Sequence, residues 1–190
     1  MDSDVRNAIY GLWLVAGFVW LLSAFAVKRT QRRQSPGSRR TYILVLVISG
    51  LLLFDNHLNV GPLNRRFLPY SLLAQYVGLI LTIVGVGFAI WARFFLGSNW
   101  SATVAVKQGH TLVRSGPYRI VRHPIYTGFL FAALGTAIAV GQFRGLVATI
   151  VAALAWRAKS LVEEQFMTEE FGAEYAAYKR EVRALIPFVW

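Results

Sequence analysis

The chain has 190 residues, of which 56% are hydrophobic, and it carries a formal net charge of +11. A soluble domain is usually about 45–50% apolar, and several apolar runs here approach the ~20 residues that cross a bilayer as a helix. The chain has no cysteine, which excludes disulfides, thiolate catalysis and thiolate metal sites. The composition therefore predicts an all-α integral membrane protein in which residues 1–190 form a single helical domain, with no room for a separate soluble domain.

Five membrane spans are predicted from the apolar runs, at about residues 8–27, 41–58, 70–91, 124–140 and 146–162. We interpret the first run as a span rather than a signal peptide, because it is long and Asp2 and Asp4 precede it. The third span contains Gly78, Gly85 and Gly87, which either let helices pack closely in lipid or are ordinary membrane glycines. A short turn separates the fourth and fifth spans, which predicts a helical hairpin.

The positive charges follow the predicted loops. Sixteen of the twenty Lys and Arg residues lie in the first and third loops, at the inner end of the fifth span or after it. The positive-inside rule places these residues, and the C-terminus with them, on the cytoplasmic side. Basic loops interleaved with membrane spans explain the charge excess without a nucleic-acid partner.

A long segment, residues 93–123, joins the third and fourth spans. Connections longer than ~12–15 residues are usually functional or disordered, and this one is rich in glycine, aromatic and apolar residues. We therefore expect an ordered cytoplasmic loop that forms a lid or binds a cofactor.

Residues 163–183 are predicted to form an amphipathic C-terminal helix. Its apolar face contains Met167, Phe171, Tyr175, Tyr178 and Val182. Gly172 weakens this helix and is a candidate break. The helix is expected either to lie along the membrane surface or to pack over the cytoplasmic loop.

The stretch HTLVRSGPYRIVRHPIYTG, residues 110–128, is a long mid-chain segment that a bilayer would reject. Pro124 marks the start of a helix, so Arg122 and His123 lie where unpaired backbone N–H groups and the positive end of the helix dipole gather. Two interpretations remain open. The segment is an anion site, or it is a basic loop that only sets the topology.

Glu163 and Glu164 follow the fifth span, and the predicted hairpin brings them near Arg122 and His123. Adjacent residues on a helix point ~100° apart, so we expect at most one glutamate to face this site. The alternative is that both belong to a solvated helix end. His110 and His123 could ligate a metal, but without cysteines or acidic residues in the loop no metal site is predicted.

The stretch 110–128, the hairpin after it and the string EEQFMTEEFGAEYAAYKREVRALIP together resemble the isoprenylcysteine carboxyl methyltransferase family, which is related to the phospholipid N-methyltransferases. The string LGSNWS, residues 96–101, is similar to prokaryotic members, which suggests a bacterial or archaeal cell membrane. The resemblance covers about half of the chain, from the third span onward. The first two spans match only as generic membrane helices.

The resemblance implies a methyltransferase that uses S-adenosylmethionine at the cytoplasmic face and takes a lipophilic acceptor from the bilayer, with membrane lipids around it and no obligate protein partner. The residues that it assigns to catalysis are Arg122 and Glu163. The residues that it assigns to the cofactor are His110, Leu112, Val113, Gly116, Pro117, Tyr118, His123, Pro124, Tyr126 and Glu164. Without the resemblance, Tyr118 and Tyr126 could equally be interfacial anchors.

Several acceptors and functions remain open at this point. A carboxylate acceptor, from an isoprenoid or a prenylcysteine-like molecule, needs a cation such as Arg122 to orient it, whereas an amine acceptor, such as a phospholipid, needs a base such as Glu163. The chain is shorter at its N-terminus than the eukaryotic enzymes, so the resemblance predicts the chemistry better than the acceptor. An NADPH-dependent membrane reductase and a non-catalytic membrane binding protein are the further alternatives.

Overall fold

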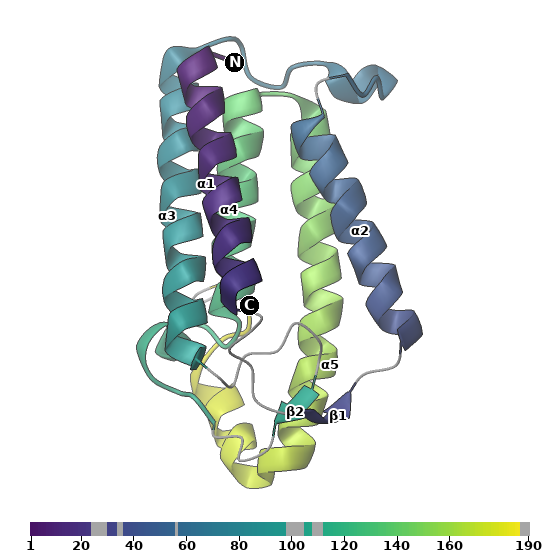
Figure 1. Ribbon diagram of the computed structural model, residues 1–190, viewed down its shortest axis with the longest axis vertical. Helices are drawn as coiled ribbons and strands as arrows, with labels where there is room; N and C mark the ends of the chain where they lie inside the picture. The colour runs from purple at the N-terminus through teal and green to yellow at the C-terminus, as the bar shows by residue number, and fades with distance from the viewer. Residues whose placement is uncertain (24–29, 34–35, 56, 98–104, 108–111, 187–190) are drawn as a thin grey trace.

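The computed structural model describes residues 1–23, 30–33, 36–55, 57–97, 105–107 and 112–186. In these ranges the chain forms the helices α1 (Ser3–Ser23), α2 (Pro36–Phe54), α3 (Leu72–Leu96), α4 (Pro124–Val140) and α5 (Phe143–Glu181). Two short 3-10 helices, η1 (Gly61–Asn64) and η3 (Gly116–Arg119), lie between them. The long helices form a bundle (Figure 1), as the sequence predicted.

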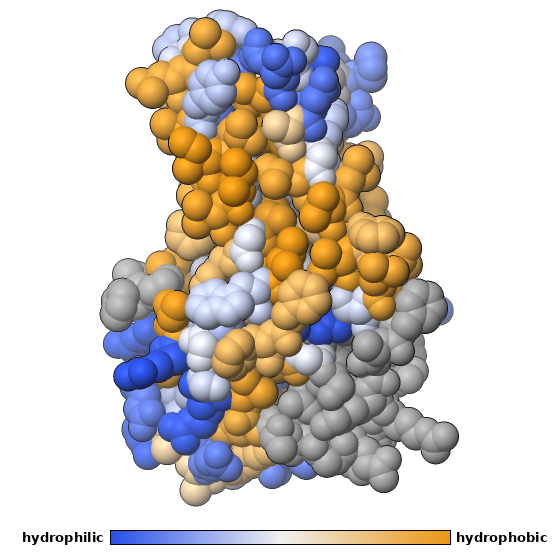
Figure 2. Space-filling model, turned by 60° about the vertical axis from the view of Figure 1, so that its left-hand side comes forward, coloured by the Kyte–Doolittle hydropathy of each residue, from blue (hydrophilic) through white to orange (hydrophobic). Residues whose placement is uncertain are grey.

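The bundle has two ends that differ in content. The hairpin end holds η1 and the turn between α4 and α5, and the sheet end holds two short strands and the last part of α5 (Figure 1). Between them the surface is largely apolar, with polar residues gathered at both ends (Figure 2). Leu14 on α1 and Leu73 on α3 are each 74% exposed, and such exposed apolar side chains suit lipid rather than water.

Three helices, α1, α3 and α5, are long and apolar enough to cross a membrane by length and composition. The Ile43–Phe54 part of α2 and all of α4 are shorter apolar helices. Together with the apolar belt, these helices make the chain an integral membrane protein.

Several helix bounds differ from the predicted spans: α2 covers residues 36–54 rather than 41–58, and polar side chains cap the starts of α1 and α3. The carboxylate of Asp2 accepts hydrogen bonds from the backbone N–H groups of Asp4 (2.9 Å) and Val5 (3.3 Å), so α1 begins at Ser3 rather than at residue 8. Ser71 caps α3 in the same way, which starts at Leu72. The helix α4 has the bounds predicted for the fourth span.

The predicted fifth span and the C-terminal helix form one element, α5. The hydropathy changes at Glu163, but the backbone continues as a helix because nothing there breaks it. The break lies at Gly172, as predicted, where φ is +50°. This left-handed conformation favours glycine.

Helices α3 and α4 are in direct backbone contact. A Cβ placed on Gly85 would lie 2.4 Å from the backbone N of Ala132, and one on Gly78 would lie 2.5 Å from the backbone O of Gly135. Gly87, by contrast, would meet nothing within 4 Å. Gly78 and Gly85 are therefore packing residues, whereas Gly87 is not.

A small antiparallel sheet pairs β1 (Thr30–Arg33) with β2 (Ala105–Lys107). The prediction of an all-α fold omitted it, because strands of three or four residues are too short to show a periodic pattern. The sheet joins the segment after α1 to the segment after α3 at the sheet end (Figure 1). The predicted ordered loop thus contains β2 and η3, and the rest of it lies partly outside the described residues.

Candidate active site

The candidate site forms where the start of α4 meets the second half of α5, at the sheet end. Arg122 and His123 precede α4, and Glu163 and Glu164 lie on α5. The hairpin brings the four side chains together, as the sequence predicted. All four are largely or fully buried, so this is not a solvated helix end.

His123 lies between the two glutamates. Its Nδ1 is 3.3 Å from Oε2 of Glu163, and its Nε2 is 3.3 Å from Oε1 of Glu164. The prediction that at most one glutamate faces the site was therefore wrong. A planar imidazole has nitrogens on two edges, so one ring can contact two carboxylates that leave the helix in different directions.

Charge strongly affects the protonation of this histidine. Burial lowers the pKa of the His123 imidazole, but hydrogen bonds and charges from Glu163 and Glu164 outweigh burial, and the net pKa lies above its usual value. The protonated ring can donate an N–H to each carboxylate, so the cluster favours the imidazolium.

Arg122 is held by Glu164 and by backbone carbonyls. Its Nη2 and Nε lie 2.7 Å and 3.0 Å from Oε1 of Glu164, and its Nη1 donates to the carbonyls of Lys179 and Val182. Only 10% of the Arg122 side chain is exposed. Its contacts make it a partner of Glu164, and its role in orienting an acceptor stays a prediction.

Glu163 has a different set of partners. The Tyr126 hydroxyl donates to its Oε1 at 2.6 Å, and the Lys159 Nζ lies 3.9 Å from the same oxygen. The Lys159 Nζ also lies 5.3 Å from the centre of the Tyr126 ring. Tyr126 thus connects α4 to Glu163 rather than acting only as an interfacial anchor.

The segment after α5 closes the start of α4. The backbone N–H groups of Arg122 and His123 donate to the carbonyls of Arg183 (2.8 Å) and Ala184 (3.0 Å), and the Thr127 hydroxyl donates to the carbonyl of Leu185 (2.6 Å). An anion site at the start of α4 stays a prediction, and any such site would have to use groups other than the backbone N–H groups of Arg122 and His123. The protein itself supplies their acceptors.

The predicted cofactor residues on η3 lie largely within the protein. Gly116 has φ +58°, and a Cβ there would lie 2.6 Å from the Phe95 ring, so the position favours glycine. Pro117 and Tyr118 are buried, as is Pro124 at the start of α4. The Tyr118 hydroxyl donates to the carbonyl of Ala92 on α3 (3.4 Å).

Leu112 and Val113 pack in two neighbouring clusters. Val113 packs with Ala92, Tyr118 and Ile125, whereas Leu112 packs on the apolar face of the last part of α5. That face, which contains the five residues predicted for it, therefore packs against the loop rather than only along the membrane surface. His110, also assigned to the cofactor, lies outside the described residues.

Sequence reasoning missed Lys179, whose Nζ lies 3.0 Å from Oε2 of Glu164. Lys179 follows the Gly172 kink, and the sequence does not show that this kink turns residue 179 back toward Glu164.

Sequence reasoning also missed Trp156, which stacks on Tyr126 with ring centres 6.1 Å apart. Its position seven residues before Glu163, on the same helical face, was an available signal. Among the described residues no group of three or more His, Cys, Asp or Glu side chains is arranged so that it could hold a metal ion.

The chain matches the sequence family described as phospholipid methyltransferase over residues 73–174, just over half of its length. The probable protein-S-isoprenylcysteine O-methyltransferase of Oryza sativa is 28% identical over 172 residues, which cover 89% of this chain and 87% of the relative. The protein-S-isoprenylcysteine O-methyltransferase of Saccharomyces cerevisiae is 34% identical over 134 residues, which cover 66% of this chain and 55% of the relative. The chain thus spans most of the rice relative and about half of the yeast one.

A solved structure has the same fold. The eukaryotic intramembrane Ras methyltransferase, isoprenylcysteine carboxyl methyltransferase, superposes with a TM-score of 0.59 over 79% of this chain and 53% of that chain, at 24% identity. The helical bundle, the buried ionic cluster and these relatives define the chain as an integral membrane methyltransferase. It belongs to the phospholipid methyltransferase family, and its isoprenylcysteine O-methyltransferase relatives bear out the resemblance drawn from its motifs.

Proposed function

We propose that the chain transfers a methyl group from S-adenosylmethionine to a carboxylate of an isoprenoid or prenylcysteine-like lipid. The observation that carries this proposal is the buried cluster of Arg122, His123, Glu163 and Glu164 at one end of an apolar hairpin. The names of the relatives supply the acceptor class. We further propose that the chain crosses the membrane five times, with the sheet end in the cytoplasm of a bacterial or archaeal cell.

The donor set of the cluster fits this cofactor. S-adenosylmethionine has a carboxylate, an ammonium group, a sulfonium and a flat adenine, and the cluster offers cations, carboxylates and aromatic faces within one buried site. We propose that Glu164 and His123 bind its polar end, with Tyr126 beside them. The residues Leu112, Val113, Gly116, Pro117, Tyr118 and Pro124, and with them His110, would shape the rest of the pocket.

When bound, S-adenosylmethionine supplies an electrophilic methyl group, which passes to an acceptor oxygen as the C–S bond breaks and its electron pair stays on sulfur. The chain holds the reacting groups in position and excludes water from them. Arg122 and Lys179 keep Glu164 ionised and fixed. Glu163 and Arg122 are the groups that we propose to lie nearest the acceptor.

The environment of Glu163 favours a carboxylate acceptor over an amine. An amine must lose a proton, which requires a general base, whereas a carboxylate is already ionised at neutral pH. Glu163 accepts a hydrogen bond from Tyr126 and lies against His123 and Lys159, and these contacts stabilise its ionised form. A carboxylate stabilised in this way is a weak base.

The experiment pairs cofactor binding with turnover in detergent-purified protein. Calorimetry with S-adenosylhomocysteine should show micromolar binding by wild type and none by His123→Ala. Labelled S-adenosylmethionine should then methylate N-acetyl-S-farnesylcysteine but not phosphatidylethanolamine. The opposite acceptor preference would establish the amine reaction, and a folded wild type that binds NADPH instead would support a reductase.

A further inference from the structure

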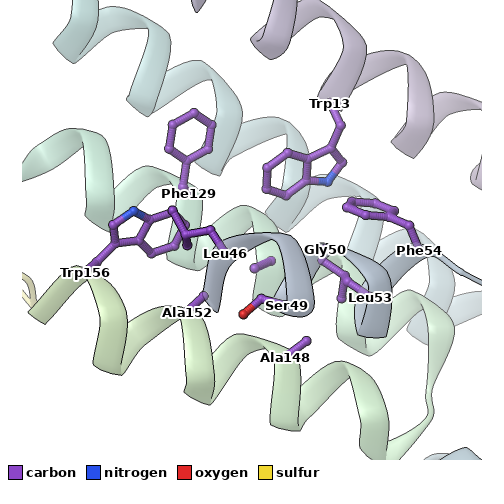
Figure 3. A pocket seen from close by; sticks show the side chains of 11 residues that line it. Trp13, Leu46, Ser49, Gly50, Leu53, Phe54, Phe129, Ala148, Ala152 and Trp156 are labelled. Carbon is purple, nitrogen blue, oxygen red and sulfur yellow. The ribbon is translucent and has the colours of Figure 1, made fainter. Parts of the chain in front are cut away.

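An apolar pocket lies between α1, α2, α4 and α5 (Figure 3). Its volume is about 230 Å³. Among the side chains that line it, the one aliphatic hydroxyl is that of Ser49, which donates to the carbonyl of Val45 in its own helix (2.9 Å). The lining therefore suits a hydrocarbon rather than a polar ligand.

Side chains of both helices of the hairpin link the lining of the pocket to the candidate active site. On α5, Ala152 and Trp156 line the pocket, and Glu163 follows on the same helical face. On α4, Phe129 lines the pocket one turn beyond Tyr126. Trp156 stacks on both of these α4 rings, at 6.1 Å and 6.0 Å between centres.

The far end of the pocket is closed by an aromatic pair from the first two helices. Trp13 and Phe54 meet edge to face with ring centres 5.5 Å apart (Figure 3). The Trp13 indole N–H donates to the Thr136 hydroxyl on α4 (3.1 Å), which fixes this wall. Both aromatic residues precede residues 73–174, the part of the chain that matches the family.

We propose that this pocket holds the hydrocarbon tail of the methyl acceptor, and that Gly50, Trp13 and Phe54 limit the length of the tail. The inference rests on the proposed function, because the tail must belong to a molecule whose head reaches Glu163. Pockets for drug-sized ligands usually enclose about 300–1,000 Å³, so the smaller volume here favours a slender chain over a fused-ring lipid. The shared part of the family would then carry the chemistry, and α1 and α2 would choose the acceptor.

Two glycines offer a matched test. Gly50 lines the pocket from α2, whereas Gly87 is exposed on α3, and an added Cβ would meet nothing within 4 Å at either position. Leucine at either position also improves helix propensity. Gly50→Leu should fill the pocket and Gly87→Leu should not.

Methyl transfer is measured with N-acetyl-S-prenylcysteines that have geranyl, farnesyl or geranylgeranyl tails. Gly50→Leu should lower kcat/KM for the longest tail by roughly tenfold relative to the shortest, since even one methylene changes hydrophobic selectivity by about that much. Gly87→Leu should retain the wild-type order of the three tails. Identical profiles for the two variants would overturn the proposal.

Photo-crosslinking provides a readout that does not need turnover. A prenylcysteine analogue with a diazirine at the tail end should label α1 and α2 near Trp13 and Phe54 in nanodisc-embedded wild type. Labelling confined to the exposed face of α3 would overturn the proposal, as would labelling of the pocket by a diazirine phospholipid that the analogue does not displace. A wild type that binds no S-adenosylhomocysteine would instead refute the proposed function itself.

Discussion

The interface of α3 with α4 and the space between α1, α2 and the hairpin represent two opposite ways to build a membrane bundle. In the first, glycines bring two backbones into contact, with no room for even one more carbon atom. In the second, aromatic side chains hold the helices apart and leave a pocket. The first lies within the part that matches the family, whereas the second combines α4 and α5 from that part with α1 and α2 from outside it. The comparison suggests that the α3–α4 interface serves as a rigid frame for catalysis, whereas the region between α1, α2 and the hairpin provides space for the acceptor.

The largest expected effect comes from breaking the tight interface. Gly85→Leu forces a side chain into the backbone of α4 and should destabilise the protein by roughly 4 kcal/mol or more, enough to abolish folding. Gly87→Leu, two residues away on the same helix, should express and unfold like wild type. Thermal unfolding in detergent measures both. Equal stability of the two variants would contradict the packing difference.

The ionic cluster of Arg122, His123, Glu163 and Glu164 also lies within the part that matches the family, and substitutions there should also destabilise the protein. Glu164→Gln leaves Arg122 and Lys179 without their buried partner and should cost about 3 kcal/mol, with loss of S-adenosylhomocysteine binding. The exposed pair of Arg114 and Glu181, 3.0 Å apart, is the control, and Glu181→Gln should cost less than about 1 kcal/mol. Calorimetry and thermal unfolding test both variants, and unchanged cofactor affinity in Glu164→Gln would exclude its proposed role.

The cluster should also make stability depend on pH through His123. Because its folded pKa lies above the usual 6.5, the stabilisation is fully present below about pH 6.5 and is lost as the pH rises through the raised pKa. The melting temperature of wild type should therefore exceed that of His123→Gln most at acidic pH, and the gap should narrow as the pH rises. His57→Gln, at an exposed position near the hairpin end, should leave the melting temperature unchanged. A gap for His123→Gln that stays constant across the pH range would show that the charge of the ring does not matter.

The smallest effect is expected in the pocket wall. Trp13→Phe removes the hydrogen bond to Thr136 but keeps an aromatic ring, and should cost about 1 kcal/mol. The extra space should at the same time raise the relative kcat/KM for the longest prenyl tail. Thr136→Ser retains the acceptor hydroxyl and is the control. A loss of stability as large as that of Gly85→Leu would mean that the helices around the pocket pack as tightly as α3 and α4.

Much of this architecture could be predicted from the sequence, because it depends on local chemistry. Pro124 determines where α4 begins, Gly172 breaks α5, and the hairpin alone brings Arg122 and His123 near the two glutamates. The position of both glutamates around one ring could not be predicted, since it depends on side-chain rotamers and on the two edges of an imidazole. The sequence also gave no sign of the pocket, which exists only because side chains from four helices fail to fill the same space.

The three carbonyls that accept hydrogen bonds from the start of α4 come from residues 183–185, which follow the end of α5. Synthesis proceeds from the N-terminus, so all five helices are made before these acceptors leave the ribosome. A chain still in translation, even one fully inserted in the membrane, therefore has an incomplete cluster at Arg122 and His123. The cluster at Arg122 and His123 is therefore completed only after all five helices have been synthesised, and we expect cofactor binding to require residues 183–185.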